Sequence, residues 1–244
     1  MSRFAIVALL SLASAAPARA ADVQALLRKA DAYRLAEGAM AVETTLETFK
    51  AGVLDKERRY LVFVRPGRRS LVLSRSPVEK GQKILMLGDD FWMVLPSSQR
   101  PIRITPAQKL LGDAAAGDVA TMAWADDYAG EVAGEEDVDG RPCLRLRLAA
   151  RRRGVTYARV ELWLSRADSR PVKADLYVAS EKLAKRASFA VEPVDGRLQV
   201  SAMTLVDQIQ TSRQTVIRYV ARRPRALPDA YFNPMFLSRN EPGE

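Results

Sequence analysis

Residues 143–149 read CLRLRLA, an alternation of apolar and basic side chains. Leu144, Leu146 and Leu148 share one face of an extended strand, because successive side chains in a strand point to opposite faces. Two later segments repeat the pattern, and their apolar positions are Val160, Leu162, Leu164, Val172, Leu176 and Val178. The alternate positions are charged or aromatic, as in Arg145, Arg147, Arg159, Glu161, Trp163, Lys173, Asp175 and Tyr177. The pattern predicts antiparallel strands with one apolar face and one wet face.

The same period of two extends outward over both halves of the chain. We expect strands at 39–50, 58–65, 70–75, 83–87 and 91–95, and again at 128–132, 143–149, 157–165, 172–179, 185–192, 198–207 and 215–221. The connectors are too short for parallel crossovers, and Asp139-Gly140 and Asp195-Gly196 are typical of tight hairpins. The strands therefore form an antiparallel sheet.

Helical patterns are few. Asp22 is a candidate N-cap, and the apolar spacing that follows, from Val23 to Tyr33, predicts one amphipathic helix that ends at Gly38. Segments 106–111 and 118–124 predict two short helical turns separated by glycines and alanines. We expect one mature domain over residues 21–244, with these turns in an insertion at about 105–126.

Composition excludes several classes of protein. The 244 residues are 48% hydrophobic and 27% charged, which is enough to bury a core. Histidine is absent and Cys143 is the one cysteine, so a histidine-based triad, a zinc cage and an internal disulfide are excluded. The 38 Lys and Arg against 29 Asp and Glu give a net charge of +9, which suits an anionic membrane, a nucleic acid or an acidic partner.

The N-terminus indicates the compartment. Arg3 precedes an apolar stretch from Phe4 to Leu12, and Ala18-Arg19-Ala20 is a small-x-small site, which together are typical of a secretory signal peptide. Removal of residues 1–20 takes away Arg3 and Arg19 and leaves 36 basic against 29 acidic groups, or +7. We expect a periplasmic protein that does not bind nucleic acid, and no later stretch has the roughly 18 apolar residues of a membrane span.

A shortage of helix predicts the shape of the sheet. About a dozen strands share an apolar face, and one helix with two short turns is too little to cover it. The sheet therefore closes into a barrel, or curls into a half-barrel whose hollow is capped by the helices and holds something apolar. A sandwich packed throughout with its own side chains is the alternative. We expect a mainly β fold, an incomplete antiparallel barrel with a helical lid over an apolar cavity.

The sequence contains acidic pairs, a calcium-loop-like segment and serines, but none of them forms a complete catalytic or metal-binding motif. The acidic pairs Asp89-Asp90 and Asp126-Asp127 lie in connectors, where carboxylates face water. The segment from Glu135 to Gly140 resembles the opening of a calcium loop, but its twelfth position is Leu146 and not a bidentate glutamate. A nucleophilic serine has no histidine and no Ser-x-x-Lys spacing to activate it. We expect no enzyme activity, no metal and no cofactor.

The middle segment carries the candidate lid residues. Leu110, Leu111, Met122 and Trp124 lie on short elements flanked by glycine, where a mobile apolar lid could fold over the concave face. Ordinary packing onto the sheet is the equal alternative. The strand at 91–95 presents Phe91 and Met93 on one face and Trp92 and Val94 on the other, and the sequence leaves open which face points inward.

Several stretches between residues 22 and 237 occur in a characteristic order. They are LGDDFWMVLPSS at 87–98, RPIRI at 100–104, LGD at 111–113, VDGRPC at 138–143, RPVKA at 170–174, and LPD at 227–229 with Phe232-Asn233. In this ordered combination the chain resembles bacterial outer-membrane lipoprotein-sorting proteins. That family is similar to the LolA-type lipoprotein carriers, whose fold is an incomplete antiparallel barrel with a helical lid. No catalytic motif comes with the resemblance.

The resemblance implies a periplasmic carrier. Its cargo would be the acyl chains of a lipoprotein, or a lipid, and its partners an inner-membrane permease, an outer-membrane acceptor and, transiently, an anionic membrane surface. The carrier itself would be a monomer. The residues expected to line the cavity and lid are Leu110, Leu111, Met122, Trp124, Phe91, Met93, Leu144, Leu146, Leu148, Val160, Leu162, Leu164, Leu176 and Val178.

A sensor of the same fold is the alternative function. RseB-type regulators of envelope-stress sigma factors resemble such carriers, but they have a second C-terminal domain for which this chain leaves few residues. A lipid carrier predicts retained lipid in the purified protein, whereas a sensor predicts a regulated protein contact.

Overall fold

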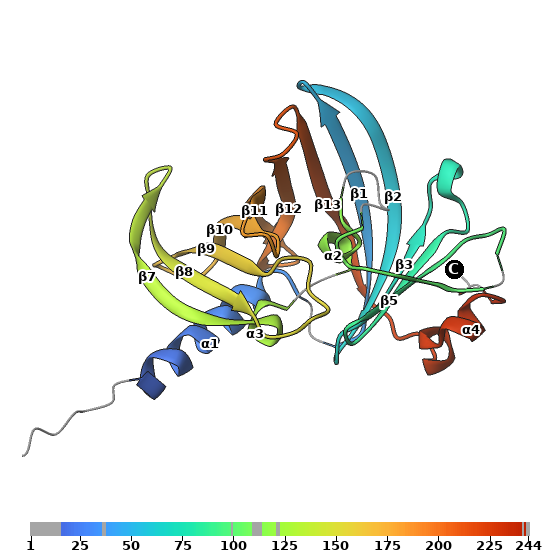
Figure 1. The fold of residues 1–244 in the computed structure, drawn as a ribbon, viewed down its shortest axis with the longest axis horizontal. Coiled ribbons are helices and arrows are strands. Elements are labelled where there is room, and N and C mark those ends of the chain that lie inside the picture. The colour runs from blue at the N-terminus through green and yellow to red at the C-terminus, as the bar shows by residue number, and fades with distance from the viewer. Residues whose placement is uncertain are drawn as a thin grey trace, which may run out of the picture.

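A computed structural model describes residues 16–35, 38–98, 100–108, 114–120, 123–240 and 242. Within these ranges one antiparallel sheet contains thirteen strands, in the order β6-β5-β4-β3-β2-β1-β13-β12-β11-β10-β9-β8-β7 (Figure 1). The strands are β1 (Met40–Lys50), β2 (Val53–Arg65), β3 (Arg69–Ser74), β4 (Lys83–Leu87), β5 (Asp90–Val94), β6 (Ile102–Ile104), β7 (Tyr128–Val138), β8 (Arg141–Ala150), β9 (Arg159–Ser165), β10 (Pro171–Tyr177), β11 (Leu183–Val194), β12 (Arg197–Asp207) and β13 (Arg213–Pro224).

The strand order leaves the sheet open. β1 pairs with both β2 and β13, so the beginning and the end of the chain meet in the middle of the sheet. β6 and β7 are its two edges, and no pairing between them occurs among the described residues. The single sheet is strongly curved (Figure 1), which confirms the half-barrel and excludes the two-sheet sandwich.

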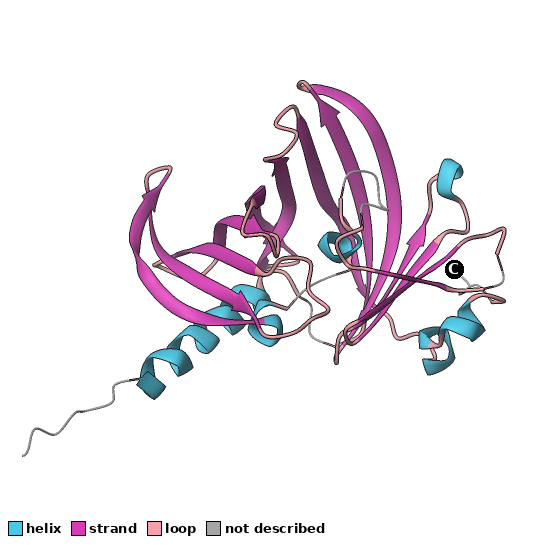
Figure 2. Ribbon diagram, viewed as in Figure 1, coloured by secondary structure: helices cyan, strands magenta, loops and turns pink. Residues whose placement is uncertain are grey.

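The helices are few and short (Figure 2). They are α1 (Ala16–Ala32), the 3₁₀ turn η1 (Pro77–Glu79), α2 (Ala116–Val119), α3 (Trp124–Asp127), the 3₁₀ turn η2 (Asp229–Phe232) and α4 (Pro234–Leu237). No helix in the described ranges is long and apolar enough to cross a membrane. α2 and α3 lie in the segment that joins the edge strands β6 and β7.

Several predicted boundaries are wrong. α1 already begins at Ala16, so Asp22 lies inside the helix and is not its N-cap. The predicted helical turn at 106–111 is described only in part: the Gln108 N–H donates to the Thr105 carbonyl at 3.1 Å, which closes a turn at Pro106-Ala107, and 109–111 lie outside the described residues. Trp124 starts a helix instead of ending one, because the carboxylate of the distant Asp31 accepts the N–H groups of Trp124 and Ala125.

Two clusters of buried side chains lie on opposite faces of the sheet. The larger joins α1, α2 and α3 to the inner face of all the long strands, through residues such as Val23, Leu27, Val119, Leu146 and Leu162. The smaller lies on the outer face of β2–β5, where Leu227, Phe232 and Leu237 of the C-terminal segment cover Phe63, Leu71, Leu73 and Leu85. The sheet is thus covered on both sides in its first half.

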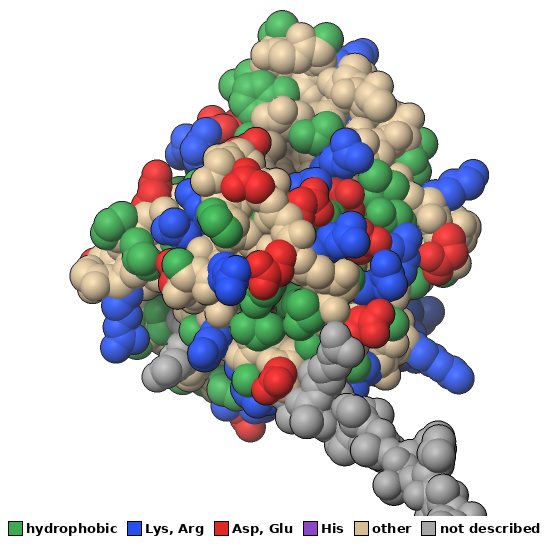
Figure 3. Space-filling view, turned by 90° about the vertical axis from the view of Figure 1, so that its left-hand side faces the viewer, with side chains coloured by type: hydrophobic (Ala, Val, Ile, Leu, Met, Phe, Trp, Pro, Cys, Tyr) green, Lys and Arg blue, Asp and Glu red, His purple; other side chains and the backbone are tan. Residues whose placement is uncertain are grey.

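The predicted wet face is confirmed on β7–β9. Acidic and basic side chains are intermixed on the side of the molecule shown in Figure 3. On these strands and the loops beside them, ion pairs join Arg147 to Glu131, Arg159 to Glu161, and Arg166 to Glu135. The hairpin at Asp139-Gly140 is also confirmed, since both residues have positive φ, 52° and 76°, as a type I′ turn requires.

Candidate functional site

Helix α1 covers the inner face of the second half of the sheet. Val23, Leu27 and Ala30 recur at helical spacing and are fully buried against the sheet cluster. The side-chain amide of Gln24 donates a hydrogen bond of 2.9 Å to the carbonyl of Tyr128, at the start of the edge strand β7. The apolar face of this half is therefore filled by the chain itself.

A buried polar network holds the lid helix α2. The Asp118 carboxylate accepts hydrogen bonds from Lys185 Nζ (2.5 Å), from the Tyr157 hydroxyl (2.8 Å) and from the Ala115 backbone N–H (2.9 Å). Asp118 and Lys185 are each 6% exposed. Burial, with the Asp118 carboxylate beside it, raises the pKa of Tyr157 well above its ordinary value, so this hydroxyl stays a donor. A charged contact between α2 and β11 thus fixes the position of a helix of only four residues.

A second polar contact joins the end of α1 to α3. Asp31 caps α3 at 3.0 and 2.8 Å, and the Arg34 guanidinium lies 3.9 Å from the centre of the Trp124 ring. The Trp124 ring in turn meets the edge of Phe189 at 5.6 Å. Burial raises the pKa of Asp31 from 3.8 to about 6, against the opposing effects of Arg34 and the two N–H groups.

Arg68 ties the two halves of the sheet together at one end of the hollow. It lies in the β2–β3 turn, pairs with the fully buried Asp127, and donates to the carbonyls of Gly88 (3.2 Å) and Gly154 (3.0 Å). Burial lowers the pKa of its guanidinium. Gly154 is needed here, because a Cβ on it would lie 2.3 Å from the Asp89 Cα. The halves therefore touch at this end.

The space left beneath the lid is small and lies over the first half of the sheet. Its volume is about 30 Å³, close to that of one water molecule and far below the roughly 300–1,000 Å³ of ligand pockets. Residues from β1, β2, β13, α2 and the loop after α1 line it, namely Arg34, Leu35, Met40, Val42, Thr44, Val62, Val64, Asp118, Val119, Tyr219 and Arg222. Among the described residues, the space beneath α2 is too small to hold a ligand.

A recess of about 200 Å³ adjoins this space and shares Leu35 and Val64 with it. Met86 and Ala123 continue its apolar lining, and the turn from Arg65 to Arg69 forms its polar rim together with Asp126.

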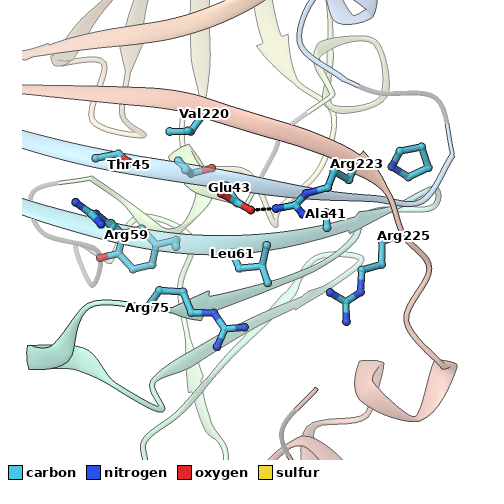
Figure 4. Close-up of a pocket in the computed structure, with 12 residues that line it drawn as sticks. Ala41, Glu43, Thr45, Arg59, Leu61, Arg75, Val220, Arg223 and Arg225 are labelled. Carbon is cyan, nitrogen blue, oxygen red and sulfur yellow. Dashed lines mark hydrogen bonds and ion pairs between the residues drawn. The ribbon is translucent and has the colours of Figure 1, made fainter. Parts of the chain in front are cut away.

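A larger groove, of about 730 Å³, lies on the outer face of β13, β1 and β2 (Figure 4). Ala41, Leu61 and Val220 form an apolar floor. The side chains of Arg59, Arg75, Arg223 and Arg225 surround it, and Arg223 pairs with Glu43 (Figure 4). This basic groove was not predicted from the sequence.

Most of the predicted cavity residues lie on the inner face, but not around the remaining space. Leu146, Leu148, Val160, Leu162, Leu164, Leu176, Phe91 and Trp124 are buried in the inner cluster, and Val178 packs against it. In β5, Phe91 points to the inner face, whereas Trp92 and Val94 belong to the outer cluster. Met93 and Leu144 are half-buried. Leu110, Leu111 and Met122 lie outside the described residues. Contact of these side chains with a ligand stays a prediction.

The residues that do line the space were missed. Val42, Val62 and Val64 alternate on β1 and β2 with the same period as the leucines of the second half, so the pattern could have identified them. Arg222 is another lining residue that was missed. It lies on the inward side of β13, and burial lowers the pKa of its guanidinium. The sequence pattern identified the apolar face of the sheet correctly. It did not show which part of that face the helices leave uncovered.

Comparison with known proteins identifies the family. A search of curated protein sequences finds no match. A family model described only as an uncharacterized protein matches residues 67–239. The chain is 31% identical to a LolA superfamily protein from Nitrosomonas europaea, whose crystal structure matches with a TM-score of 0.80 over 86% of this chain and 96% of that one.

Two further crystal structures share the fold. A DUF1329 family protein from Desulfovibrio piger is 24% identical, with a TM-score of 0.72 over 88% of this chain and 97% of that one. A Vibrio parahaemolyticus domain described as an outer membrane lipoprotein-sorting protein is 19% identical, with a TM-score of 0.73 over 88% and 98%. The open thirteen-stranded sheet, its helical lid and the identity to the Nitrosomonas protein lead to one conclusion: the chain belongs to the LolA superfamily.

Proposed function

We propose that the protein is a periplasmic carrier, which binds the acyl chains of a lipoprotein or a lipid between its sheet and its lid and delivers them between membranes. The observation that carries this proposal is the construction of the lid. An apolar face with Val42, Val62 and Val64 is closed by helices of four residues each, too short to be stable alone. Side-chain contacts hold these helices, and such contacts can be released and remade.

Cargo binding requires the lid to move. The closed space of about 30 Å³ cannot take an acyl chain. Each methylene that leaves water gains about 0.8 kcal/mol, so a chain of several carbons offsets the loss of the Asp118–Lys185 and Arg34–Trp124 contacts. A loaded protein therefore has an open lid, and an empty protein has the closed form described above.

The polar residues at the space suit the head of an amphiphile. Arg34 and Arg222 border it, and each guanidinium is a donor for a phosphate or carboxylate. In the closed form Arg222 donates to the Val200 carbonyl at 2.6 Å and Arg34 lies over Trp124. When the lid opens, Arg34 leaves the Trp124 ring and becomes available to an anionic head.

The remaining features of the proposal concern where the carrier works. The signal peptide at residues 1–20 directs export and is then removed. The mature form is a single domain of residues 21–244, in which residues 105–126 form the lid insertion. Its partners are an inner-membrane permease and an outer-membrane acceptor. The proposal includes no catalytic residue, since no step of it changes a covalent bond.

The experiment is a lipid inventory of the protein purified from the periplasm of an expressing host. Mass spectrometry of its organic extract should find lipid or diacylated peptide, and the delipidated protein should bind a fluorescent fatty acid. Val62→Phe, which fills the inner space, should weaken that binding at least about tenfold. Leu61→Phe, on the outer face of the same strand, is the matched control. An extract without lipid, together with a probe that does not bind, would refute the carrier.

A sensor or adaptor of the same fold is the second candidate, and the basic outer groove favours it. A groove with Arg59, Arg75, Arg223 and Arg225 fits an acidic protein partner by charge. Affinity capture from membrane extracts distinguishes the two functions. A sensor yields a stable partner whose binding changes when a fatty acid is added, whereas a carrier transfers the fatty acid to acceptor vesicles.

A further inference from the structure

The β1–β2 hairpin projects beyond its neighbour. β3 pairs with β2 only from Tyr60 to Arg65, so Val53–Arg58 have no strand on that side in the described part of the chain. The pattern predicted β2 from residue 58, but the strand begins at Val53, directly after the turn at Ala51-Gly52. The ribbon and its turn stand at the top of the molecule (Figure 1).

The β12–β13 turn lies beside this tip. Lys50 of β1 is paired with Arg213 of β13, and the Ala51 N–H donates to the Ser212 carbonyl at 2.8 Å. The Asp207 carboxylate holds the turn by accepting the N–H groups of Ile209 and Gln210, both at 2.8 Å. Two ordered turns thus form one rim of the sheet, which we call the hairpin rim (residues 50–56 and 207–213).

The hairpin rim exposes large apolar side chains. Val53 is 70% exposed, Leu54 51% and Ile209 69%. None of the three belongs to either core cluster of the described residues. Side chains of this size gain free energy when they leave water, so three of them on one projecting edge mark a surface that meets an apolar partner.

The charges on the hairpin rim indicate which partner. Lys50, Lys56 and Arg213 are basic, whereas the carboxylate of Asp207 is buried in its turn. Asp55, the other acidic residue of the rim, lies 3.9 Å from Lys56. Apolar side chains flanked by cations are typical of segments that lie in the interface of an anionic bilayer.

We infer that the hairpin rim docks the protein on the surface of an anionic phospholipid bilayer, with Val53, Leu54 and Ile209 inserted among the headgroups. A bilayer is flat and is reached first by projecting tips, whereas a protein interface needs a continuous complementary face. The inference rests on the proposed carrier function for its purpose, because docking brings the lid close to the membrane that supplies or accepts the lipid.

Vesicle sedimentation tests the inference. The protein purified from the periplasm is mixed with phosphatidylglycerol–phosphatidylethanolamine vesicles or with phosphatidylcholine vesicles. Val53→Asp with Ile209→Asp should lower partitioning onto the anionic vesicles at least about tenfold. Val78→Asp is the matched control, because Val78 is 79% exposed on η1, outside both the rim and the basic groove, and this variant should bind like the unmodified protein. Lys50→Gln with Lys56→Gln should reduce binding to the anionic vesicles only, and added salt should have the same effect.

A second measurement guards against a misfolded variant. Ile209→Trp keeps an apolar side chain at the rim, and its added fluorescence should shift to the blue with anionic vesicles, whereas Val78→Trp should give no shift. Equal partitioning of the rim variant and the control would overturn the inference. A rim variant that still binds vesicles like the unmodified protein but no longer binds a membrane protein would also overturn the inference.

The outcomes separate docking from carriage. If the rim variant retains lipid in its extract but no longer sediments with vesicles, both the inference and the carrier are supported. If no form of the protein contains lipid and vesicle binding still depends on Val53 and Ile209, the carrier fails and the docking surface stands. If lipid is retained and the rim variants bind vesicles like the unmodified protein, only the docking inference is refuted.

Discussion

Replacement of Lys185 by methionine should open the lid. Lys185 Nζ on β11 lies 2.5 Å from the Asp118 carboxylate on α2, and both residues are buried. Methionine has a similar length, so it removes the charge and leaves the packing nearly unchanged. In the variant, Asp118 is a buried carboxylate without its cation whenever the lid is closed, and a hydrated one when the lid is open.

The size of the effect follows from the contacts that remain. Removal of one partner of a buried ion pair typically costs about 3–5 kcal/mol. Asp118 keeps its hydrogen bonds from Tyr157 and Ala115, so we expect the lower figure, about 3 kcal/mol. Since about 1.4 kcal/mol is a factor of ten, the ratio of open to closed lid should rise about 100-fold.

Hydrogen exchange measures this ratio directly. The N–H groups of Trp124 and Ala125 in the lid segment donate to the Asp31 carboxylate of α1, so they are protected only while the lid lies against α1. They should exchange faster in Lys185→Met, by up to about 100-fold, while the amides of β8 and β9 keep their rates. Lys182→Met is the matched control, because Lys182 is an exposed lysine just before β11, so the same substitution there leaves no buried carboxylate without its cation.

Two results would refute this reasoning. Unchanged exchange at Trp124 and Ala125 would mean that the ion pair does not hold the lid. Equal acceleration in the lid and in β8 would mean that Lys185 stabilises the whole domain. A double variant, Asp118→Asn with Lys185→Met, should restore much of the protection, because it leaves no buried charge.

Three further predictions use other parts of the structure. The pKa of Asp31 is raised in the folded state from 3.8 to about 6, so folding favours its protonated form and stability should fall as pH rises between about 4 and 6; Asp31→Asn should flatten this part of the Tm profile, and an unchanged slope would assign it to another group. Gly154→Ala should cost about 1–3 kcal/mol in chemical denaturation, because its Cβ would meet the Asp89 backbone, and an unchanged midpoint would contradict the close approach. Leu110→Asp with Leu111→Asp should weaken lipid retention while circular dichroism shows the same strand content, and full retention would remove both residues from the lid.

The sheet could be predicted because its signals are local. The alternation in CLRLRLA places Leu146 and Leu148 on the inner face with no knowledge of their neighbours, and Asp139-Gly140 specifies its turn within two residues. The half-barrel was then predicted because the predicted helices are too few and too short to cover the apolar face of so many strands. These inferences hold because each depends on residues that are close in the sequence.

The lid contacts could not be predicted because they join distant residues. Asp118 and Lys185 are 67 positions apart, and Asp31 and Trp124 are 93 apart. Nothing near Asp31 marks it as the cap of a helix that begins at residue 124. The location of the remaining space depends on the same long-range packing, since Val23 and Leu27 fill the half of the sheet that the leucine pattern favoured.

The polar character of the lid contacts is itself an argument about function. Apolar packing of the same area would stabilise the closed lid by an amount that grows with every methylene, and cargo would have to displace it. A buried ion pair contributes little net free energy, since desolvation offsets attraction, but it specifies one geometry. Asp118 with Lys185, and Arg34 over Trp124, therefore define where the lid closes without making the closed state much more stable than the open one. A carrier that must both hold and release an apolar cargo needs this near balance, because a deep minimum on either side would stop the cycle.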